Sequence, residues 1–291
     1  MHCAVVESRI QVIDYIKNKV ITIMNNIRKV KNKNEQDIDE YIHSIYTDDS
    51  IYKVETICRK YNKESKEYVE RLLSDKLDLV RRVFQQGVMV DLCCGTGEHL
   101  FELQDLSSQC IGIDFCEPYI EEARKRAKQC GLDNISLDVG DAKNLAIESG
   151  SIATLYCFSA LYAISKQEEV IAEISRVLEP GGVCVLDMGN SKSINSYCLK
   201  YYGELPPSFR IPVSEMKEII CQNNLRIIHH RAFQLLPLWA GKPGWLKPLL
   251  HPVWKKIMST RIREKMLDEW LSSLPLVKIY AFRHLFVCEK I

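Results

Sequence analysis

The sequence VMVDLCCGTG, residues 88–97, decides the fold of this chain. A short apolar run that ends in an acid is typical of a buried parallel strand, because neighbouring layers cover such strands on both faces. The glycines that follow allow the backbone to turn sharply and to approach a ligand closely. A helix is predicted to begin at Glu98, and the unpaired N–H groups of a helix N-terminus attract anionic or polar ligand groups. The stretch therefore predicts a strand, a ligand-binding turn and a helix in succession.

The chain then alternates between strand and helix patterns up to residue 187. The helix predicted at 167–178 is stopped by Pro180-Gly181-Gly182, because proline cannot continue a helix and glycine supplies the turn. Such alternation is typical of a parallel sheet with helices on both faces. Right-handed crossovers place the carboxyl ends of the strands along one edge, where the ligands of such sheets bind. The predicted strands are 110–114, 135–139, 152–158 and 183–187, and the predicted helices are 117–129 and 167–178.

Acidic residues stand at the ends of two of these strands. Asp114 closes the second strand, and Asp141 follows the third in the turn Gly140-Asp141-Ala142. Asp114 can accept hydrogen bonds from a ligand, or it can cap the helix that follows, since Asp is a preferred N-cap residue. Asp141 can likewise bind a ligand or belong to an ordinary Gly-Asp turn.

Residues 88–97, taken together with these later signals, resemble the class I S-adenosylmethionine (SAM) methyltransferases. The first motif of that family is a hydrophobic strand and Asp, then two residues, then C/G-G-T/S-G. The resemblance covers residues 85–190. It implies an α/β fold with a doubly wound, mostly parallel, seven-stranded sheet, and SAM as the cofactor. A dinucleotide-dependent oxidoreductase is disfavoured, because its fingerprint needs a glycine where Leu100 stands.

The resemblance also implies roles for single residues. Asp114 would bind the cofactor's ribose, Asp141 and Ala142 its adenine, and Phe158 would form the edge of the methyl-transfer pocket. Tyr61, followed by Tyr68, resembles a signature that folds a helix over the cofactor; alternatively, the two tyrosines share a packed helix face. The predicted cofactor-binding residues are Asp91, Cys93, Gly95, Thr96, Gly97, Asp114, Phe115, Asp141, Ala142, Phe158 and Tyr61.

The composition argues against several other classes of protein. A net charge of +1 over 291 residues gives no case for nucleic-acid binding, which usually involves a strongly basic domain. No apolar run reaches the length of a membrane span and the N-terminus does not resemble a secretion signal, so we expect a cytoplasmic protein. The twelve cysteines form no Cys-x-x-Cys pair. We therefore expect a reducing compartment and no metal.

Four segments are predicted along the chain. A helical N-terminal extension packs over the cofactor site, the SAM-binding core follows, and a lid or cap insertion precedes the closing strand of the core sheet. The closing strand, predicted at 277–288, pairs antiparallel with a strand at 225–233. The segment bounds are 1–84, 85–233, 234–275 and 276–291.

The insertion has an unusual composition. No Asp or Glu stands between Glu218 and Glu264, whereas Lys, Arg and Trp are frequent there. The segment is predicted either as a lid over the acceptor pocket or as a helical cap whose tryptophans pack on the core and whose lysines are solvated. Trp and Lys interleaved with Leu also suit a membrane interface, so a peripheral membrane contact through 235–258 is a further hypothesis.

The sequence predicts methyl transfer from SAM to an O or N atom of a small-molecule or lipid-linked acceptor, without nucleic acid as a partner. The alternative is a SAM-binding protein without turnover, such as a regulatory or assembly partner. Positioning can supply much of the acceleration of methyl transfer, and a base is required only where the acceptor must lose a proton. Near the expected mouth of the site lie His99, Tyr162, Arg283 and His284. None of them is assigned as catalytic, and the catalytic residues stay unknown.

Overall fold

The computed structural model describes residues 66–291 except 203–207, 239, 241, 252 and 264. Side chains are described from Glu70 onward. Tyr61 and most of the predicted N-terminal extension therefore lie outside the described residues.

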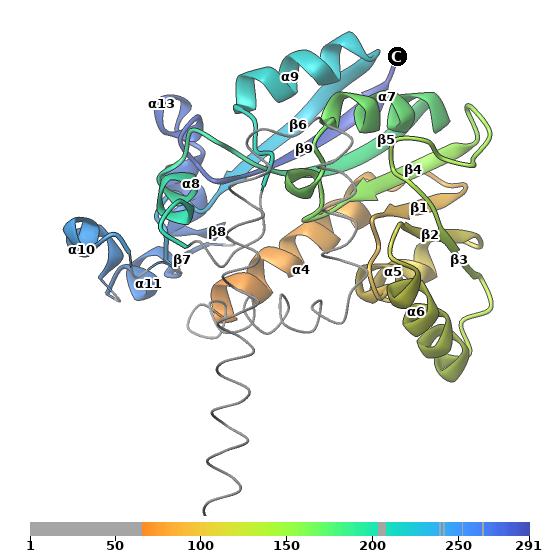
Figure 1. Ribbon diagram of the computed structural model, residues 1–291, viewed down its shortest axis with the longest axis horizontal. Helices are drawn as coiled ribbons and strands as arrows, with labels where there is room; N and C mark the ends of the chain where they lie inside the picture. Colours follow the sequence, from red (N-terminus) through yellow and green to blue (C-terminus); the bar gives the residue numbers. More distant parts are fainter. Residues whose placement is uncertain (1–65, 203–207, 239, 241, 252, 264) are drawn as a thin grey trace, which may run out of the picture.

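A seven-stranded sheet in the order β3-β2-β1-β4-β5-β9-β6 forms the centre of the described chain (Figure 1). Neighbouring strands from β3 to β5 are parallel. β9 runs antiparallel between β5 and β6. The predicted fold class, a doubly wound and mostly parallel sheet of seven strands, is confirmed. The strands are β1 Met89–Leu92, β2 Cys110–Asp114, β3 Ile135–Val139, β4 Ile152–Cys157, β5 Leu178–Gly189, β6 Leu225–Phe233 and β9 Arg283–Lys290.

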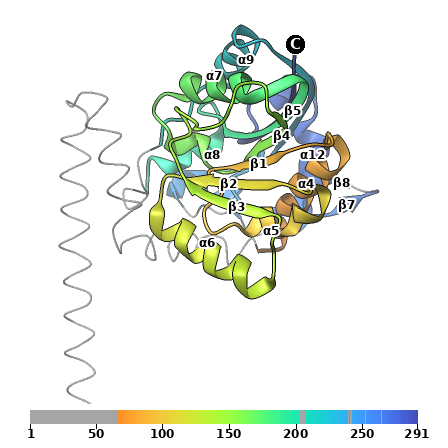
Figure 2. The ribbon, with the colours of Figure 1, turned by 90° about the vertical axis from the view of Figure 1, so that its right-hand side faces the viewer.

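Helices cover both faces of this sheet, as Figure 2 shows. On one face lie α4 Lys66–Val83, α5 Glu98–Leu103 and α6 Glu117–Cys130; on the other lie α7 Gln167–Val177 and α9 Val213–Gln222. All four residues of β1 are buried, because both of its faces are covered. In α6 the buried residues Ile120, Ala123 and Ala127 recur at helical spacing and join the core cluster that contains Met89 and Tyr156.

The connection from β6 to β9 includes residues 234–275, the segment predicted as a lid or cap insertion. Its elements are η4 Gly244–Leu246, α10 Lys247–Leu250, α11 Val253–Met258, β7 Arg261–Ile262, β8 Lys265–Met266, α12 Leu267–Ser272 and α13 Pro275–Lys278. The remaining elements are η2 Gln104–Leu106, η3 Leu161–Ala163 and α8 Ile194–Leu199.

The start predicted for the closing strand is wrong. Residues 277–282 do not belong to β9, which begins at Arg283. Val277, Ile279 and Ala281 alternate with polar or aromatic residues as in a strand, but Pro275 stands at the start of α13. Proline is favoured there because its fixed φ suits the first helical turn. The Lys278 N–H then donates to the Leu274 carbonyl over 2.8 Å, which continues the helical turn.

Within the part of the chain that the structure describes, no helix has both the length and the apolarity needed to cross a membrane.

Candidate cofactor and acceptor site

The turn after β1 has the tight backbone that its glycines predict. Cys93, Gly95 and Gly97 all have positive φ, at 61°, 55° and 79°. A Cβ at Gly97 would lie 2.8 Å from the ring of Phe101, so a side chain there would collide as well as strain the backbone. Cys93 differs from the two glycines because it carries a side chain, and a left-handed conformation costs such an L-residue roughly 1–2 kcal/mol. The loop therefore holds one strained side-chain residue at the end of the strand.

Asp114 ties this loop to the end of β2. Its Oδ2 accepts the Gly95 N–H and its Oδ1 accepts the Cys116 N–H, both over 2.9 Å. The N-cap residue of α6 is Cys116, and no side chain caps that helix. Asp114 is thus not the helix cap that the sequence left open as an alternative. Each carboxylate oxygen has a further lone pair and can still accept a hydrogen bond from a ligand hydroxyl.

Opposing effects act on the pKa of the Asp114 carboxyl group. Burial raises the pKa of its carboxyl group, while backbone N–H groups of Cys116, Gly95 and Phe115 lower it. The net pKa lies above the usual value for Asp. N–H groups that bond the ionised form are the ordinary means of keeping a buried carboxylate charged.

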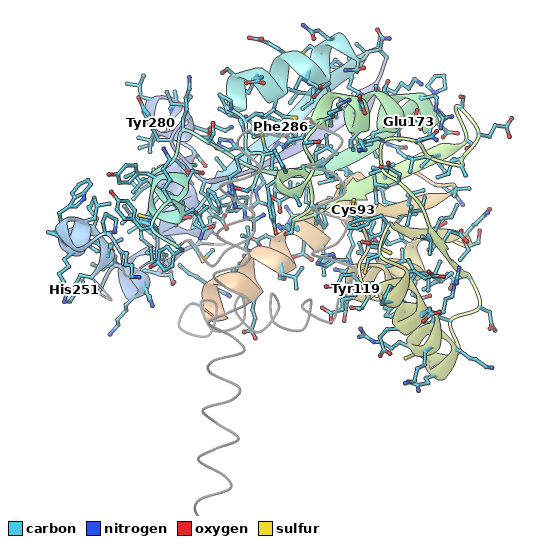
Figure 3. All side chains as sticks on the ribbon, viewed as in Figure 1. Cys93, Tyr119, Glu173, His251, Tyr280 and Phe286 are labelled. Carbon is cyan, nitrogen blue, oxygen red and sulfur yellow. The ribbon has the colours of Figure 1, made fainter. Side chains whose placement is uncertain are left out.

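A cavity of about 570 Å³ opens at the carboxyl ends of four adjacent parallel strands. Its walls come from the loop after β1, the end of β2, the turn after β3 and the segment that runs from β4 through η3. A smaller recess of about 210 Å³ lies against the glycine loop and shares Cys93, Gly95 and Tyr119 with the cavity; Cys93 and Tyr119 are labelled in Figure 3. The cavity is lined by Leu92, Cys93, Gly95, Ile113, Asp114, Phe115, Tyr119, Val139, Gly140, Asp141, Ala142, Lys143, Phe158, Ser159, Ala160, Tyr162, Ala163 and Ile164.

Most of the predicted cofactor residues meet at this cavity, although they come from four separate loops. The predicted residues in its wall are Cys93, Gly95, Asp114, Phe115, Asp141, Ala142 and Phe158. Thr96 lines the recess instead. Gly97 lines neither space and begins α5 as its N-cap residue.

Asp91 lies beneath the loop and does not line the cavity. It is almost wholly buried and pairs in register with Tyr156 of β4. Burial raises its pKa well above the usual value, the charge of Asp114 adds to the rise, and the Tyr156 hydroxyl partly offsets it. Asp91 is therefore no part of the described cavity wall, and the cofactor role expected for it stays a prediction.

Asp141 differs from Asp114 in its exposure. Its Oδ1 accepts the Lys143 N–H over 2.9 Å, which forms the tight turn that the Gly-Asp sequence predicts. The side chain is exposed to solvent at the rim of the cavity. The turn and the ligand role are compatible, because the second carboxylate oxygen can accept from a ligand amino group.

The four residues expected near the mouth of the site, His99, Tyr162, Arg283 and His284, lie in different surroundings. His99 lines the recess and packs edge-on against Phe158, with ring centroids 5.6 Å apart. Burial, together with the charge of Lys76, lowers its pKa to about 4, so its imidazole is neutral at pH 7. Tyr162 lines the cavity itself.

His284 lies in the sheet, away from the cavity wall. It is fully buried, and its Nδ1 lies 2.8 Å from Nε2 of His230. Its Nε2 donates to the Ala281 carbonyl over 3.1 Å. Burial is the main reason why the pKa of His284 is lowered to about 4. His284 is therefore a neutral structural residue.

A buried charged cluster behind the cavity was missed by the sequence analysis. Lys76 of α4 and Arg283 of β9 both bind Oδ2 of Asp187, the latter over 2.9 Å. Ser159 Oγ, in the cavity wall, lies 3.2 Å from the Lys76 Nζ and 3.3 Å from Asp187 Oδ2. Ser159 has a positive φ of 57°, and non-glycine residues in that conformation are often found at functional sites.

The two positive side chains of this cluster stabilise the ionised form of Asp187. Burial would raise the pKa of Asp187, but Arg283 and Lys76 outweigh it, so the carboxyl group has a pKa below the usual value. Asp187 closes a predicted strand and could have been suspected from the sequence. Lys76 could not, because 111 residues separate it from Asp187.

The residues present suit a cofactor that combines an amino acid with a nucleoside. The glycine loop leaves open space, since a Cβ at Gly95 would meet nothing within 4 Å. At Gly140, in the turn after β3, a Cβ would lie 3.0 Å from the Ile113 side chain, so the turn packs closely against β2. Asp114 and Asp141 supply acceptors for hydroxyl and amino groups. Among the described residues, no group of His, Cys, Asp and Glu is arranged to hold a metal ion.

A family model described as a methyltransferase domain matches residues 84–239, more than half of the chain. The chain therefore belongs to the methyltransferase domain family. The family predicted from the sequence is confirmed, and SAM is the cofactor to which the family match points.

Curated relatives match the core of the chain. A demethylmenaquinone methyltransferase of Lactococcus lactis is 37% identical over 102 residues, which are 33% of this chain and 40% of the relative. A dTDP-3-amino-3,4,6-trideoxy-alpha-D-glucopyranose N,N-dimethyltransferase of Streptomyces venezuelae is 31% identical over 118 residues, or 39% of this chain and 48% of the relative. The chain thus spans less than half of either relative's length.

Solved structures share the fold. The YcgJ protein of Bacillus subtilis covers 75% of this chain and 98% of its own, with a TM-score of 0.52 at 15% identity. The geranyl diphosphate C-methyltransferase of Streptomyces coelicolor, solved with S-adenosyl-L-homocysteine, covers 80% of this chain and 84% of its own, with a TM-score of 0.55 at 14% identity. At such identities the likeness shows the fold alone.

Proposed function

We propose that this chain transfers the methyl group of SAM to an O or N atom of a small-molecule or lipid-linked acceptor. The observation that carries the proposal is the single cavity at the ends of β3, β2, β1 and β4, where the glycine loop, Asp114 and Asp141 meet. The relatives named for a demethylmenaquinone and for an amino sugar support a small-molecule acceptor.

Each part of the cavity has a task in this proposal. SAM supplies the reactive methyl group on its sulfonium. The loop around Gly95 receives the amino-acid end of the cofactor, Asp114 accepts from the ribose hydroxyls, and Asp141 with Ala142 binds the adenine. Phe158 and Ser159, after β4, border the space left for the acceptor.

Positioning is the main contribution expected from the protein. Holding an acceptor in line with the S–CH3 bond replaces a bimolecular encounter by a nearly unimolecular step, and this alone can supply a large part of the acceleration. An amine acceptor needs no base if it binds neutral, whereas a hydroxyl acceptor must lose a proton. Of the four residues expected near the mouth, Tyr162 and the neutral His99 line these two spaces and are the candidates to accept such a proton.

The second candidate is a SAM-binding protein without turnover. The cavity residues alone do not separate this alternative from an enzyme, because the cofactor half of the site would be the same in both. The family membership favours the enzyme.

Calorimetric titration of the purified full-length chain with SAM, S-adenosylhomocysteine and NADH tests the cofactor site. Both sulfur ligands should bind and NADH should not. Binding of NADH alone, or of none of the three by a folded sample, would overturn the proposal.

An acceptor screen then separates turnover from binding. Formation of S-adenosylhomocysteine should be measured with hydroxyl, amine and carbon acceptors, both water-soluble and lipid-linked. Turnover with an O or N acceptor supports the proposal. Turnover with carbon acceptors alone contradicts the predicted atom, and binding without any turnover favours the non-catalytic alternative. A cytoplasmic location and the exclusion of nucleic acid stay predictions.

A further inference from the structure

The outer side of the β6–β9 connection carries apolar side chains that are largely exposed. Trp245 is 67% exposed, Val253 47% and Ile257 37%. In Figure 1, α10 and α11 form the end of the described molecule opposite α6, and His251 between them is labelled at that end in Figure 3. Together with the exposed Lys247 and Lys256, these three apolar residues are called the cap surface.

The helix α11 carries two apolar stripes. Trp254 and Met258, four residues apart, pack against the core cluster. Val253 and Ile257, also four apart, lie roughly 100° round the helix from that pair and are exposed. A surface helix of a soluble domain normally buries its apolar stripe. The core therefore explains the first stripe of α11 and leaves the second unexplained.

An aromatic row continues from Trp245 onto α8. The ring of Trp245 meets that of Tyr197 edge-on at 5.9 Å, and Tyr197 meets Tyr201 in the same way at 5.6 Å. The hydroxyl groups of Tyr197 and Tyr201 are 2.8 Å apart. Lys200 lies over the Tyr197 ring, 5.9 Å from its centroid. Trp and Tyr, with an apolar body and a polar tip, are the side chains enriched where hydrocarbon meets water.

The charge of the β6–β9 connection points to the chemistry of the partner. No Asp or Glu stands between Glu218 and Glu264, whereas eight Lys and Arg residues do. Arg226 and Arg231 lie on β6 and pair with acids, and the other six follow β6. Exposed apolar residues interleaved with lysines match an anionic lipid surface, since the rings and aliphatic chains enter the headgroup layer and the ammonium groups meet phosphates. An acidic protein partner would satisfy the charges but not the outward row of Trp, Val and Ile.

We propose that the cap surface docks this chain on bilayers that contain anionic phospholipid. The contact is peripheral, since no described helix can span a membrane. It is a separate activity from methyl transfer, and its test does not depend on the identity of the acceptor. The lid role predicted for 234–275 gains no support, because the described wall of the cavity draws no residue from that segment.

Co-sedimentation of the full-length chain with vesicles provides the test. Vesicles of phosphatidylcholine with one third phosphatidylglycerol should bind the protein, and pure phosphatidylcholine vesicles should bind it at least about tenfold less. Binding should weaken as salt is raised from 0.05 to 0.5 M, because exposed charges are then screened. Equal binding to both vesicles, or none to either, would overturn the proposal.

Matched variants separate the cap surface from the rest of the molecule. Val253→Ser with Ile257→Ser should reduce binding about tenfold, whereas Ile228→Ser, at a site that is likewise 47% exposed but on β6, should not. Lys247→Glu with Lys256→Glu should reduce binding more than Lys128→Glu with Lys217→Glu, although both pairs change the net charge equally. Equal losses in test and control variants would show that the surface is not specific.

A second measurement tests whether the cap surface binds another copy of this chain instead of lipid. Analytical ultracentrifugation without lipid should give the same mass for the parent chain and for the Val253→Ser, Ile257→Ser variant. A dimer that this variant dissociates, with vesicle binding unchanged, would assign the surface to self-association and refute lipid docking. Circular dichroism of each variant checks that the fold is retained.

Discussion

At one edge of the sheet β3, β2, β1 and β4 run parallel, and their terminal loops surround a cavity of about 570 Å³. At the other edge β9 runs antiparallel between β5 and β6, and the chain that connects β6 to β9 carries an excess of exposed apolar and basic side chains. The parallel half is held by backbone geometry: left-handed turns and one carboxylate that accepts two N–H groups. The antiparallel half contains a buried charged cluster as well, in which Asp187 of β5 binds Lys76 of α4 and Arg283 of β9. The first arrangement creates an empty space for a ligand, and the second fixes helices against the sheet.

The buried charges at the boundary between the halves should give the largest effect on stability. Asp187→Ala removes the shared partner of Lys76 and Arg283 and should lower the free energy of unfolding by about 3–5 kcal/mol, because a buried charge is left uncompensated. Lys76→Met should cost less, since Asp187 keeps Arg283. Urea denaturation followed by circular dichroism measures both; similar losses would mean that Arg283 alone does not compensate the charge of Asp187.

Substitutions of Asp114 test whether the parallel half of the sheet binds SAM at this carboxylate. Asp114→Ala should weaken SAM binding about 10- to 150-fold, the effect of losing one charge-assisted hydrogen bond. Asp114→Asn keeps one acceptor oxygen and should lose less. Asp138→Ala, an exposed acid on the neighbouring strand, is the control and should bind normally. Calorimetry with parallel thermal unfolding gives the answer, and unchanged affinity in a folded Asp114→Ala protein would limit Asp114 to holding the loop.

The contact of α12 with α4 should depend on pH. Burial and the neighbouring Asp75 raise the pKa of Glu269 to about 8, and Arg231, at 3.2 Å, only partly offsets this. The folded state then binds a proton more tightly than the unfolded state does. Stability from this group is present at pH 4.5 and below, and it is lost as pH rises towards 8. Glu269→Gln should flatten the decline of the unfolding midpoint between pH 5 and 8; an identical pH profile in the variant would refute the assignment.

Cys93 should give the smallest effect, with a sign that depends on backbone geometry. Cys93→Gly relieves the positive φ and should raise the free energy of unfolding by up to about 1 kcal/mol, the strain less the entropy that glycine loses on folding. Cys94→Gly is the matched control and should destabilise, because Cys94 is buried and has no such strain. Chemical denaturation of the two variants measures both changes, and a loss of stability in Cys93→Gly would show that packing outweighs strain there.

Much of the parallel half could be predicted because its signals are local. The strands at 110–114 and 135–139 have the bounds expected from the sequence, and the helix that begins at Glu117 ends one residue later than expected. Apolar runs, acids and glycine turns follow each other within a few residues there. The start of β9 was wrong because an alternating pattern was read as a strand although Pro275 favours a helix.

The sequence by itself determined the order of strands and helices, the glycine turn and the set of acids that follow the strands, because hydrophobic periodicity and turn chemistry act over short stretches of chain. Only the tertiary structure decided that Asp91 lies beneath the loop while Asp114 faces the cavity, since that depends on the face of the sheet and on its neighbours. The same holds for Lys76 beside Asp187 and for the outward side of α11. These features arise from packing between distant segments, which no local pattern encodes.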